Sequence, residues 1–340
     1  MNTGVDEKSS HFYTLSMEST EFSVLYQDHH LLIVNKPARV VIHPTYKHAD
    51  GTMWDALLSY LEQQGEDDWQ PPDLPDEPEW ARAPAHIQEM LREKRRERLW
   101  KEEGLLARPC LLHRLDKDTS GVVALARTER ACRHVIQQFY EHTIVKCYLA
   151  VVQKGAPDWT RPRTDFIVST RQDDENEVRM GESFDPFLLG NRELVLDGPL
   201  RRASEDRRRC IVGPNGQEAR TVVRLLAVEG KFALLAVRPI TGRTHQIRAH
   251  LAALGYAIMG DKMYGLPAGD GTPEAALKRQ FLHAYSLELR RYPDNTLCRF
   301  VAPLAEDLVV WMERYFPEGL DVLNDRSSIS GEYAVLCQSE

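Results

Sequence analysis

The chain has 340 residues, of which 42% are hydrophobic and 28% charged, and its formal net charge at pH 7 is -8. This balance is typical of a globular protein and excludes a disordered or fibrous one. The longest apolar run, residues 251–259, is less than half of the ~20 residues that a membrane-spanning helix needs. The polar start contains no apolar signal region, so we expect a cytoplasmic protein without a membrane segment.

The regular elements are predicted from apolar alternation and from helical spacing. In chain order we expect strands 22–26 and 31–35, helices 52–61 and 87–103, strands 110–115 and 122–127, helix 129–140, strand 143–152, strands 220–228 and 232–237, helix 244–254, strands 282–289 and 298–301, and helix 305–315. Interleaved hairpins and helices favour an α+β fold whose mixed, mainly antiparallel sheet is flanked by helices and loops.

Two segments, at about 62–108 and 155–215, interrupt this order. Residues 66–79 hold seven carboxylates and four prolines, which predict an exposed, irregular stretch. The helix after it mixes six basic with five acidic side chains, as a solvated helix does, and an RNA-contacting arm is the alternative. Residues 155–215 are polar and predicted to be irregular. Their basic run 207–209 is either a solvated loop or a phosphate contact.

The acidic total conceals two basic segments. Residues 105–154 carry a net charge of +4 and residues 219–264 one of +5, which leaves -17 for the rest of the chain. If the two segments meet in the fold, they form a basic face on an acidic body, which suits a nucleic acid. Chance clustering of solvated charges is the alternative that composition alone leaves open.

The cysteines are widely and irregularly spaced and include no Cys-x-x-Cys pair. A disulfide framework or a structural zinc site would show tighter spacing. We therefore predict reduced thiols, most of them buried as small hydrophobic side chains. The six are Cys110, Cys132, Cys147, Cys210, Cys298 and Cys337.

Residues 113–121 form a polar loop between two apolar strands, and this loop is the first candidate site. An aspartate in such a loop can face a cleft at the end of a sheet. Arg114 and Lys117 flank Asp116, and their positive charges favour its ionised form. An ionised carboxylate can act as a nucleophile or as a base. On spacing alone, a hairpin turn with ordinary surface charges is the favoured interpretation.

Residues 238–251 form the second candidate site. Thr241 or Thr244 is a candidate N-cap for the helix that follows. Arg248 lies about one turn after Thr244 on the same face, so it can reach across a cleft from the start of the helix. A surface charge is the alternative interpretation of this arginine.

The predicted strand 143–152 supplies the third candidate site. Alternation along the strand puts Lys146 and Tyr148 on one face, opposite Cys147 and Leu149. Two polar-tipped side chains on one face can line a pocket, and an exposed strand face is the alternative.

Together with shorter motifs, these segments resemble the RluA family of RNA pseudouridine synthases. The resemblance covers roughly residues 21–315 and is specific because the motifs occur in the expected order. They are Val34-Asn35-Lys36-Pro37 with Val41-Ile42-His43-Pro44, His113-Arg114-Leu115-Asp116 with Thr119-Ser120-Gly121, Lys146-x-Tyr148-x-Ala150, residues 238–248, Gly260-Asp261 with Tyr264-Gly265, and Leu282-His283-Ala284. One departure is Arg39, where the family often has glycine.

The resemblance implies one pseudouridine synthase catalytic domain at 21–320, interrupted by the two insertions, with an extension at 1–20 and a tail at 321–340. It implies isomerisation of a uridine in structured RNA, ribosomal or transfer, with no cofactor or metal. RNA is the expected partner, and no obligate protein partner is evident. By motif position, Asp116 is the expected catalytic aspartate, Arg248 its partner and Tyr148 the active-site tyrosine. The expected RNA contacts are Arg114, which enters the RNA stack, and Lys36, Lys146, Arg243 and His245.

A base inside a stack is inaccessible, so the reaction requires base flipping, which costs a few kcal/mol. Whether Asp116 is a nucleophile or the base that starts elimination stays open. A non-catalytic RNA-binding or RNA-folding factor on the same scaffold is the runner-up function. A metal-dependent hydrolase built on His113, His245 and His250 is a weaker alternative, because a spacing of five residues suits shared ligation poorly.

Overall fold

The structure, a computed structural model, describes residues 22–44, 50–65, 69, 75–162, 166–170, 177–179 and 193–325. Predictions for the extension 1–20, for Cys337 and for most of 66–74 lie outside these residues. The strands are β1 (Ser23–Gln27), β2 (Leu31–Lys36), β3 (Leu105–Leu111), β4 (Ser120–Thr128), β5 (Val145–Lys154), β6 (Ile167–Thr170), β7 (Glu177–Arg179), β8 (Glu193–Asp197), β9 (Leu200–Arg202), β10 (Cys210–Val212), β11 (Arg220–Glu229), β12 (Phe232–Pro239), β13 (Tyr256–Ile258), β14 (Leu282–Arg290) and β15 (Leu297–Val301). The helices are α1 (Met53–Glu62), α2 (Ala85–Glu103), α3 (Glu129–Tyr140), α4 (Gln246–Ala253), α5 (Pro273–Ala276), α6 (Glu306–Tyr315) and α7 (Pro317–Asn324), with 3-10 turns η1 (Pro78–Arg82) and η2 (Asp158–Thr160).

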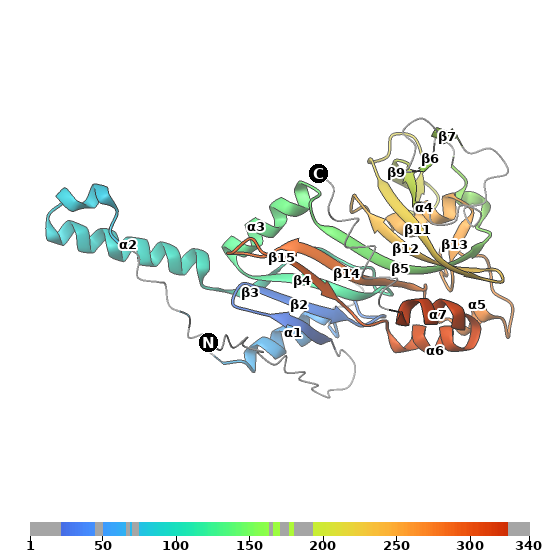
Figure 1. Cartoon of the computed structure of the whole chain (residues 1–340), viewed down its shortest axis with the longest axis horizontal. Coiled ribbons are helices and arrows are strands. Elements are labelled where there is room, and N and C mark those ends of the chain that lie inside the picture. Colours follow the sequence, from blue (N-terminus) through green and yellow to red (C-terminus); the bar gives the residue numbers. More distant parts are fainter. Residues whose placement is uncertain are drawn as a thin grey trace, which may run out of the picture.

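One long sheet runs through the molecule (Figure 1). Its strand order is β1-β2-β4-β14-β5-β12-β11-β8-β6-β7, with β3, β13 and β15 pairing to β4, β5 and β14 beside this path. β14 runs parallel to β4, whereas the other named strand pairs of the described residues are antiparallel. The predicted α+β class and mixed, mainly antiparallel sheet are therefore confirmed.

Helices cover both faces of the sheet around β2 and β4. Alternation along β2 sends Leu31 and Ile33 into the core beneath α3. It sends Leu32 and Val34 into the core beneath α1. Because both faces are buried, β2 and β4 are nearly continuous apolar runs. This layer holds the loop between β3 and β4, which carries the first candidate site.

The other end of the sheet has a separate core. Strands β5, β12, β11 and β8 contribute buried side chains, together with α4 and α6. Phe232 of β12 packs edge-on against Trp311 of α6, with ring centroids 5.4 Å apart. All eight residues of α4 are buried, so any polar side chain on it needs an internal partner. This end of the sheet therefore supplies the second and third candidate sites.

Two predictions of regular structure are wrong. The strand expected at 110–115 ends at Leu111, so residues 112–119 are loop. The segment 155–215 is not irregular, since it contributes β6, β7 and β8 to the sheet and β9 with β10 as a separate ribbon. Leu194 and Leu196 of β8 face the core, but this strand has only five residues, begins with Glu193 and ends with Asp197, and it lies in a polar segment. Helix α7, which ends at Asn324, and the strand β13 were not predicted, and β13 is too short for a periodic signal.

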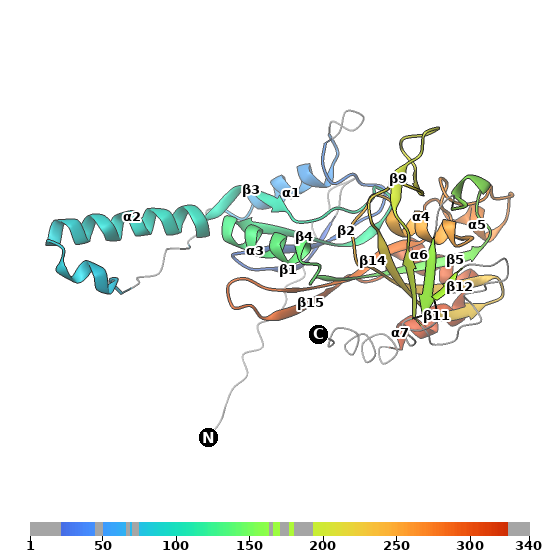
Figure 2. The ribbon, with the colours of Figure 1, turned by 90° about the horizontal axis from the view of Figure 1, so that it is seen from above.

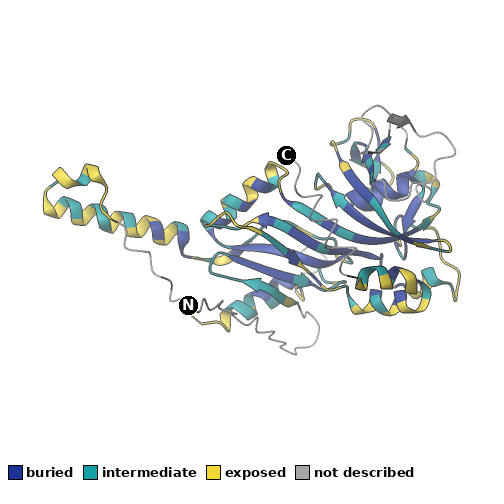
Figure 3. Cartoon of the chain, viewed as in Figure 1, coloured by how far each residue is buried: buried dark blue, intermediate teal, exposed yellow. Residues whose placement is uncertain are grey.

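Helix α2 projects away from the body (Figures 1 and 2), and most of its length is exposed (Figure 3). Its predicted solvated character is confirmed. Its C-terminal end is anchored to the body, where Arg130 of α3 donates to Glu103 at 3.0 Å and the Tyr292 hydroxyl donates to the same carboxylate at 2.6 Å. Residues 75–79, which precede the helix, are exposed as predicted and lead into η1.

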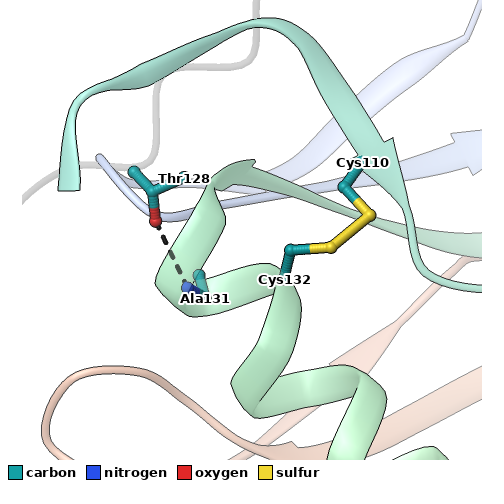
Figure 4. The surroundings of a disulfide bond; sticks show 4 residues. All are labelled: Cys110, Thr128, Ala131 and Cys132. Carbon is teal, nitrogen blue, oxygen red and sulfur yellow. Dashed lines mark hydrogen bonds between the residues drawn. A yellow bond between two sulfur atoms is a disulfide. The ribbon is translucent and has the colours of Figure 1, made fainter. Parts of the chain in front are cut away.

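A disulfide joins Cys110 of β3 to Cys132 of α3 (Figure 4), so the prediction of reduced thiols is wrong for this pair. The two Cα atoms lie 6.2 Å apart, within the range that a disulfide spans. The packing of α3 against β3 brings them together across 22 residues, a separation that no short-motif rule covers. Cys147 and Cys210 are reduced and buried, as predicted, and Cys298 is reduced and partly exposed.

Candidate active site

The three candidate sites meet in one cavity of about 420 Å³. The loop 112–119 forms one wall, β5 the floor, and the end of β12 with the start of α4 the opposite wall. Segments from the two basic parts of the chain therefore face each other, as a basic face requires. The cavity brings together seven of the eight predicted site residues: Arg114, Asp116, Lys146, Tyr148, Arg243, His245 and Arg248.

Asp116 and Arg248 form the central contact of the cavity. Nη1 of Arg248 donates to Oδ2 of Asp116 at 3.0 Å, although the two residues are 132 positions apart. The Asp116 side chain is 30% exposed, which leaves a carboxylate face open to a ligand. Arg248 is only 7% exposed, so the guanidinium is fixed inside the protein.

Asp261 holds Arg248 in place from behind. Nε and Nη2 of Arg248 donate to its two carboxylate oxygens at 2.6 and 2.9 Å, a bidentate arrangement. Burial alone would lower the pKa of Arg248, but its bonds to Asp261 and Asp116 outweigh burial and raise that pKa. Asp261 also accepts from the backbone N–H groups of Met263 and Tyr264 at 2.9 and 3.0 Å. The carboxylate is therefore saturated and cannot move without releasing Arg248.

The turn before α4 aims its first residues into the cavity. His245, at the N-cap, has a φ of 54° and makes no side-chain cap. Gln246 secures the turn instead, because its Oε1 accepts from the Thr241 hydroxyl at 2.7 Å and from the Arg243 N–H at 3.0 Å. The prediction that Thr241 or Thr244 caps this helix is therefore wrong.

Lys146 and Tyr148 point into the cavity from β5, as strand alternation predicts. Cys147 lies on the opposite face, in a small cluster that contacts α7. Nζ of Lys146 donates to the Thr241 carbonyl at 3.2 Å, and burial lowers the pKa of Lys146 to about 8. Burial, and then the negative charge of Asp116, raise the pKa of Tyr148, so its phenol stays protonated at neutral pH.

His245 lies beside the central carboxylate, with its Nε2 3.8 Å from Oδ2 of Asp116. Its Nδ1 lies 3.1 Å from the Tyr264 hydroxyl, which itself donates to the Cys210 carbonyl at 3.0 Å. Burial lowers the pKa of His245, so the imidazole is mainly neutral at pH 7. Through Tyr264, the cavity is tied to β10 of the second insertion.

Lys36 was predicted to contact RNA, and its position contradicts this. Its side chain is 0% exposed, and Nζ donates to the carbonyls of Pro37, Lys117 and Thr119 at 2.7, 3.0 and 2.9 Å. Burial lowers the pKa of Lys36 to about 7. Because two of the three carbonyls belong to the loop 112–119, Lys36 is a positioning residue for the loop of Asp116.

The motif around His283 supports the same loop. Gly121 has a φ of 117°, and a Cβ there would lie 2.1 Å from the Ala284 carbonyl oxygen, so only glycine permits β4 to approach β14 this closely. Beside it, Ser120 Oγ lies 2.9 Å from His283 Nδ1 in the buried interior. The Leu282-His283-Ala284 motif is thus part of the framework of the site.

Asp261 is the main site residue that sequence reasoning missed. The motif Gly260-Asp261 carried a signal, since Asp261 is one of two acidic residues in the basic segment 219–264. A carboxylate isolated among basic and apolar residues needs an internal partner if it is buried. Nothing in the spacing identifies that partner as Arg248.

The histidines of the metal-hydrolase alternative do not meet around a common centre. His250 Nδ1 lies 2.9 Å from Thr221 Oγ1 and its Nε2 lies 2.9 Å from the Gly198 carbonyl oxygen. His113 Nε2 accepts from the Ala124 N–H at 3.1 Å. The favoured interpretation of His250, a hydrogen-bonded structural group, is confirmed.

Arg114 and Arg243 lie at the exposed rim of the cavity, where Arg243 Nε donates to the Glu218 carbonyl at 3.0 Å. Both guanidinium groups can reach a ligand that enters the cavity. Among the described residues, no helix combines the length and apolar character needed to cross a bilayer.

Comparison with known proteins identifies the family of the chain that carries this site. A model of the RNA pseudouridylate synthase family matches residues 30–253, roughly two thirds of the chain. An RNA pseudouridine synthase of Chloroflexus aurantiacus is 33% identical over 294 residues, which cover 86% of this chain and 67% of that protein. Ribosomal large subunit pseudouridine synthase D of Nitrosomonas europaea is 28% identical over 301 residues, covering 87% and 66%. The chain thus spans about two thirds of the length of these relatives.

A solved structure, human RNA pseudouridylate synthase domain containing 4, aligns with a TM-score of 0.48 at 21% identity, covering 86% of this chain and 92% of that one. The chain belongs to the family of RNA pseudouridine synthases. It is an isomerase that acts on uridine in RNA, as the sequence resemblance predicted.

Proposed function

We propose that this chain converts a uridine of large-subunit ribosomal RNA to pseudouridine, with Asp116 as the catalytic carboxylate. The relatives from Nitrosomonas europaea and Borreliella burgdorferi are both named ribosomal large subunit pseudouridine synthase D, which supports this choice of RNA. The contact between Asp116 and Arg248 in the cavity is the single observation that carries the catalytic assignment.

The reaction breaks the C1′–N1 glycosidic bond, turns the uracil and forms a C1′–C5 bond. C5 then loses its proton and N1 gains one, so the product is an isomer of the substrate. The detached base must stay in place, so the reaction needs an enclosed pocket from which uracil cannot diffuse. The carboxylate of Asp116 attacks the sugar as a nucleophile or removes a sugar proton to start elimination. Arg248 keeps that carboxylate oriented in both cases, since its guanidinium is itself fixed by Asp261.

Tyr148 is the stacking surface for the uracil. It faces the cavity from β5 and its phenol stays protonated, so it offers an aromatic face and a hydrogen-bond donor. Arg114, Lys146, Arg243 and His245 are the proposed RNA contacts, and Arg114 fills the space that the flipped nucleotide leaves in the RNA stack.

Residues 21–320 form one catalytic unit in this proposal. The cavity takes its walls from the loop 112–119, from β5 and from α4, and these segments belong to two separate cores of one sheet. A cut between the cores would therefore divide the site.

The test replaces Asp116 by asparagine and measures pseudouridine in an in-vitro transcript of large-subunit ribosomal RNA. Asp116→Asn should retain RNA binding and lose at least about a thousandfold in single-turnover rate, because an amide is neither a nucleophile nor a base. Asp270→Asn, in an exposed loop, is the matched control and should keep the wild-type rate. Substantial turnover by Asp116→Asn would remove Asp116 from its role. A wild-type protein that binds RNA without forming pseudouridine would favour a non-catalytic RNA-binding factor.

A further inference from the structure

A second hollow, of about 660 Å³, adjoins the candidate active site. Arg248 lines both cavities, and the loop of Asp116 separates them. Asp116 faces the active-site cavity, whereas the next two residues of the loop line the second hollow. The two cavities are thus opposite sides of one wall.

The exposed side chains of this hollow are mainly cationic. They come from four separate parts of the chain, namely the segment after β2, the loop 112–119, the ribbon of β9 and β10, and the connection from β13 to β14. Two acidic residues, Asp118 and Asp206, also line the hollow, and Asp206 is already paired with Arg208 at 2.7 Å and with Arg209 at 3.4 Å. The exposed cations are Arg39, Lys117, Arg208, Lys262 and Lys278.

Three of these cations have no ion pair in the part of the chain that the structure describes. No carboxylate there lies within 4.0 Å of the charged nitrogen atoms of Arg39, Lys262 or Lys278. Like charges that converge on one hollow repel one another, and an anionic ligand relieves this repulsion. The hollow is therefore suited to a polyanion.

Arg39 is the most informative of the three. Its φ is 68°, in the left-handed region that favours glycine, and a side chain there costs conformational energy. The chain nonetheless carries an arginine at this position, and the arginine lies at the edge of the hollow. A strained side chain at the edge of a ligand-sized hollow points to a functional role for Arg39.

We propose that this basic hollow binds phosphates of the RNA strand that flanks the uridine held in the active-site cavity. This inference rests on the proposed function. A flipped nucleotide keeps its backbone connections, so the neighbouring phosphates must cross the surface beside the cavity mouth. Arg114 and Arg243 receive the strand at the rim of the active-site cavity, and the basic hollow receives it beyond the loop of Asp116. Spaced cations of this kind set the register of a strand without reading its sequence.

The test uses Arg39→Gly and Lys278→Gln, alone and combined, with Arg314→Gln as the matched control. Glycine is favoured at a φ of 68°, so Arg39→Gly removes the charge without a folding cost. Arg314 is exposed near the end of α6 and does not line the hollow. Filter binding of the large-subunit ribosomal RNA transcript is measured from 0.05 to 1 M salt, and the single-turnover rate is measured at saturating RNA.

Each substitution should reduce the slope of log K against log salt by about 0.7–0.9, which corresponds to roughly five- to eightfold weaker binding at 0.1 M salt. The effect should vanish as the salt concentration approaches 1 M. The rate at saturating RNA should stay within about twofold of wild type, because the hollow holds phosphates and not the reacting base. In the double variant, the slope should fall by about twice as much as it does in either single variant.

Unchanged slopes for Arg39→Gly and Lys278→Gln would overturn the assignment, whether or not the wild type forms pseudouridine. Weakened binding of poly-L-glutamate without weakened binding of RNA would also overturn it, and would assign the hollow to an acidic protein. Absence of pseudouridine in the wild-type reaction would instead overturn the proposed function. The two failures are therefore read from different measurements.

Discussion

Replacing Arg248 by alanine should lower the free energy of unfolding of the protein as well as abolish its activity. Arg248 is the buried link between the exposed carboxylate of Asp116 and the fully buried carboxylate of Asp261. Sequence reasoning alone predicts that Arg248→Ala loses activity with little loss of fold. The structure changes this expectation, because the substitution leaves the Asp261 charge buried without its guanidinium.

Removing one partner of a buried ion pair costs about 3–5 kcal/mol. Exposure of the Asp261 side chain is 0%, so solvent screening does not reduce this cost. At about 2.1 cal/mol/K per residue, unfolding entropy converts the loss to a fall in Tm of roughly 4–7 °C for 340 residues. The single-turnover rate should fall at least about a hundredfold, since the charge that orients Asp116 is gone.

The double variant Arg248→Met with Asp261→Asn separates the two effects. The amide oxygen at position 261 can still accept from the N–H groups of Met263 and Tyr264, and no charge is buried. Replacing a buried ion pair by neutral groups is often nearly neutral, so Tm should return at least half-way to wild type. Activity should not return.

Thermal melts followed by circular dichroism and pseudouridine formation in single turnover measure these outcomes. A double variant as unstable as Arg248→Ala would show that the stranded carboxylate is not the cause. A wild-type rate in Arg248→Ala would exclude Arg248 as the partner of Asp116.

Three further predictions follow from the same site. As pH rises through about 8, Lys146 loses its charge, so RNA affinity at 0.1 M salt should fall about five- to eightfold between pH 7 and 9, and Lys146→Arg should remove this dependence. Lys36→Met leaves three buried carbonyls without their ammonium donor, so the free energy of unfolding should fall by about 1–3 kcal/mol or more, and the single-turnover rate should be slower. An unchanged rate would mean that other contacts hold the loop of Asp116. Gly121→Ala should leave little soluble protein, whereas Gly230→Ala, with no atom within 4 Å of its Cβ, should stay soluble; equal yields would contradict the close approach of β4 to β14.

Local patterns predicted most helices and strands because apolar residues recur along each of them with a period that is typical of a helix or of a strand. The helix 129–140 is found at its predicted bounds, and β2 and β14 differ from prediction by one residue. Prediction failed where the signal was short or diluted. β13 has three residues, and the strands between 166 and 212 have three to five residues each inside a polar segment.

The candidate site was predictable to the extent that its residues lie in contiguous motifs. Asp116, Tyr148 and Arg248 were selected from three motifs, and the structure places all three in one cavity. The orientation of the Lys36 side chain was not predictable. Its motif shows that a lysine is present, but it does not show whether the ammonium group faces solvent or is buried against carbonyl groups.

The amino-acid order by itself determined the α+β elements, the family and the central carboxylate of the site, since these depend on periodicity and on contiguous motifs. Only the tertiary structure decided that Asp261 anchors Arg248, that Cys110 pairs with Cys132, and that Arg39 opens onto a second hollow. The physical reason is that each of these depends on which elements pack against each other. The disulfide needs α3 against β3, and the contact of Asp261 with Arg248 needs α4 against the segment after β13, and no local pattern contains such a contact.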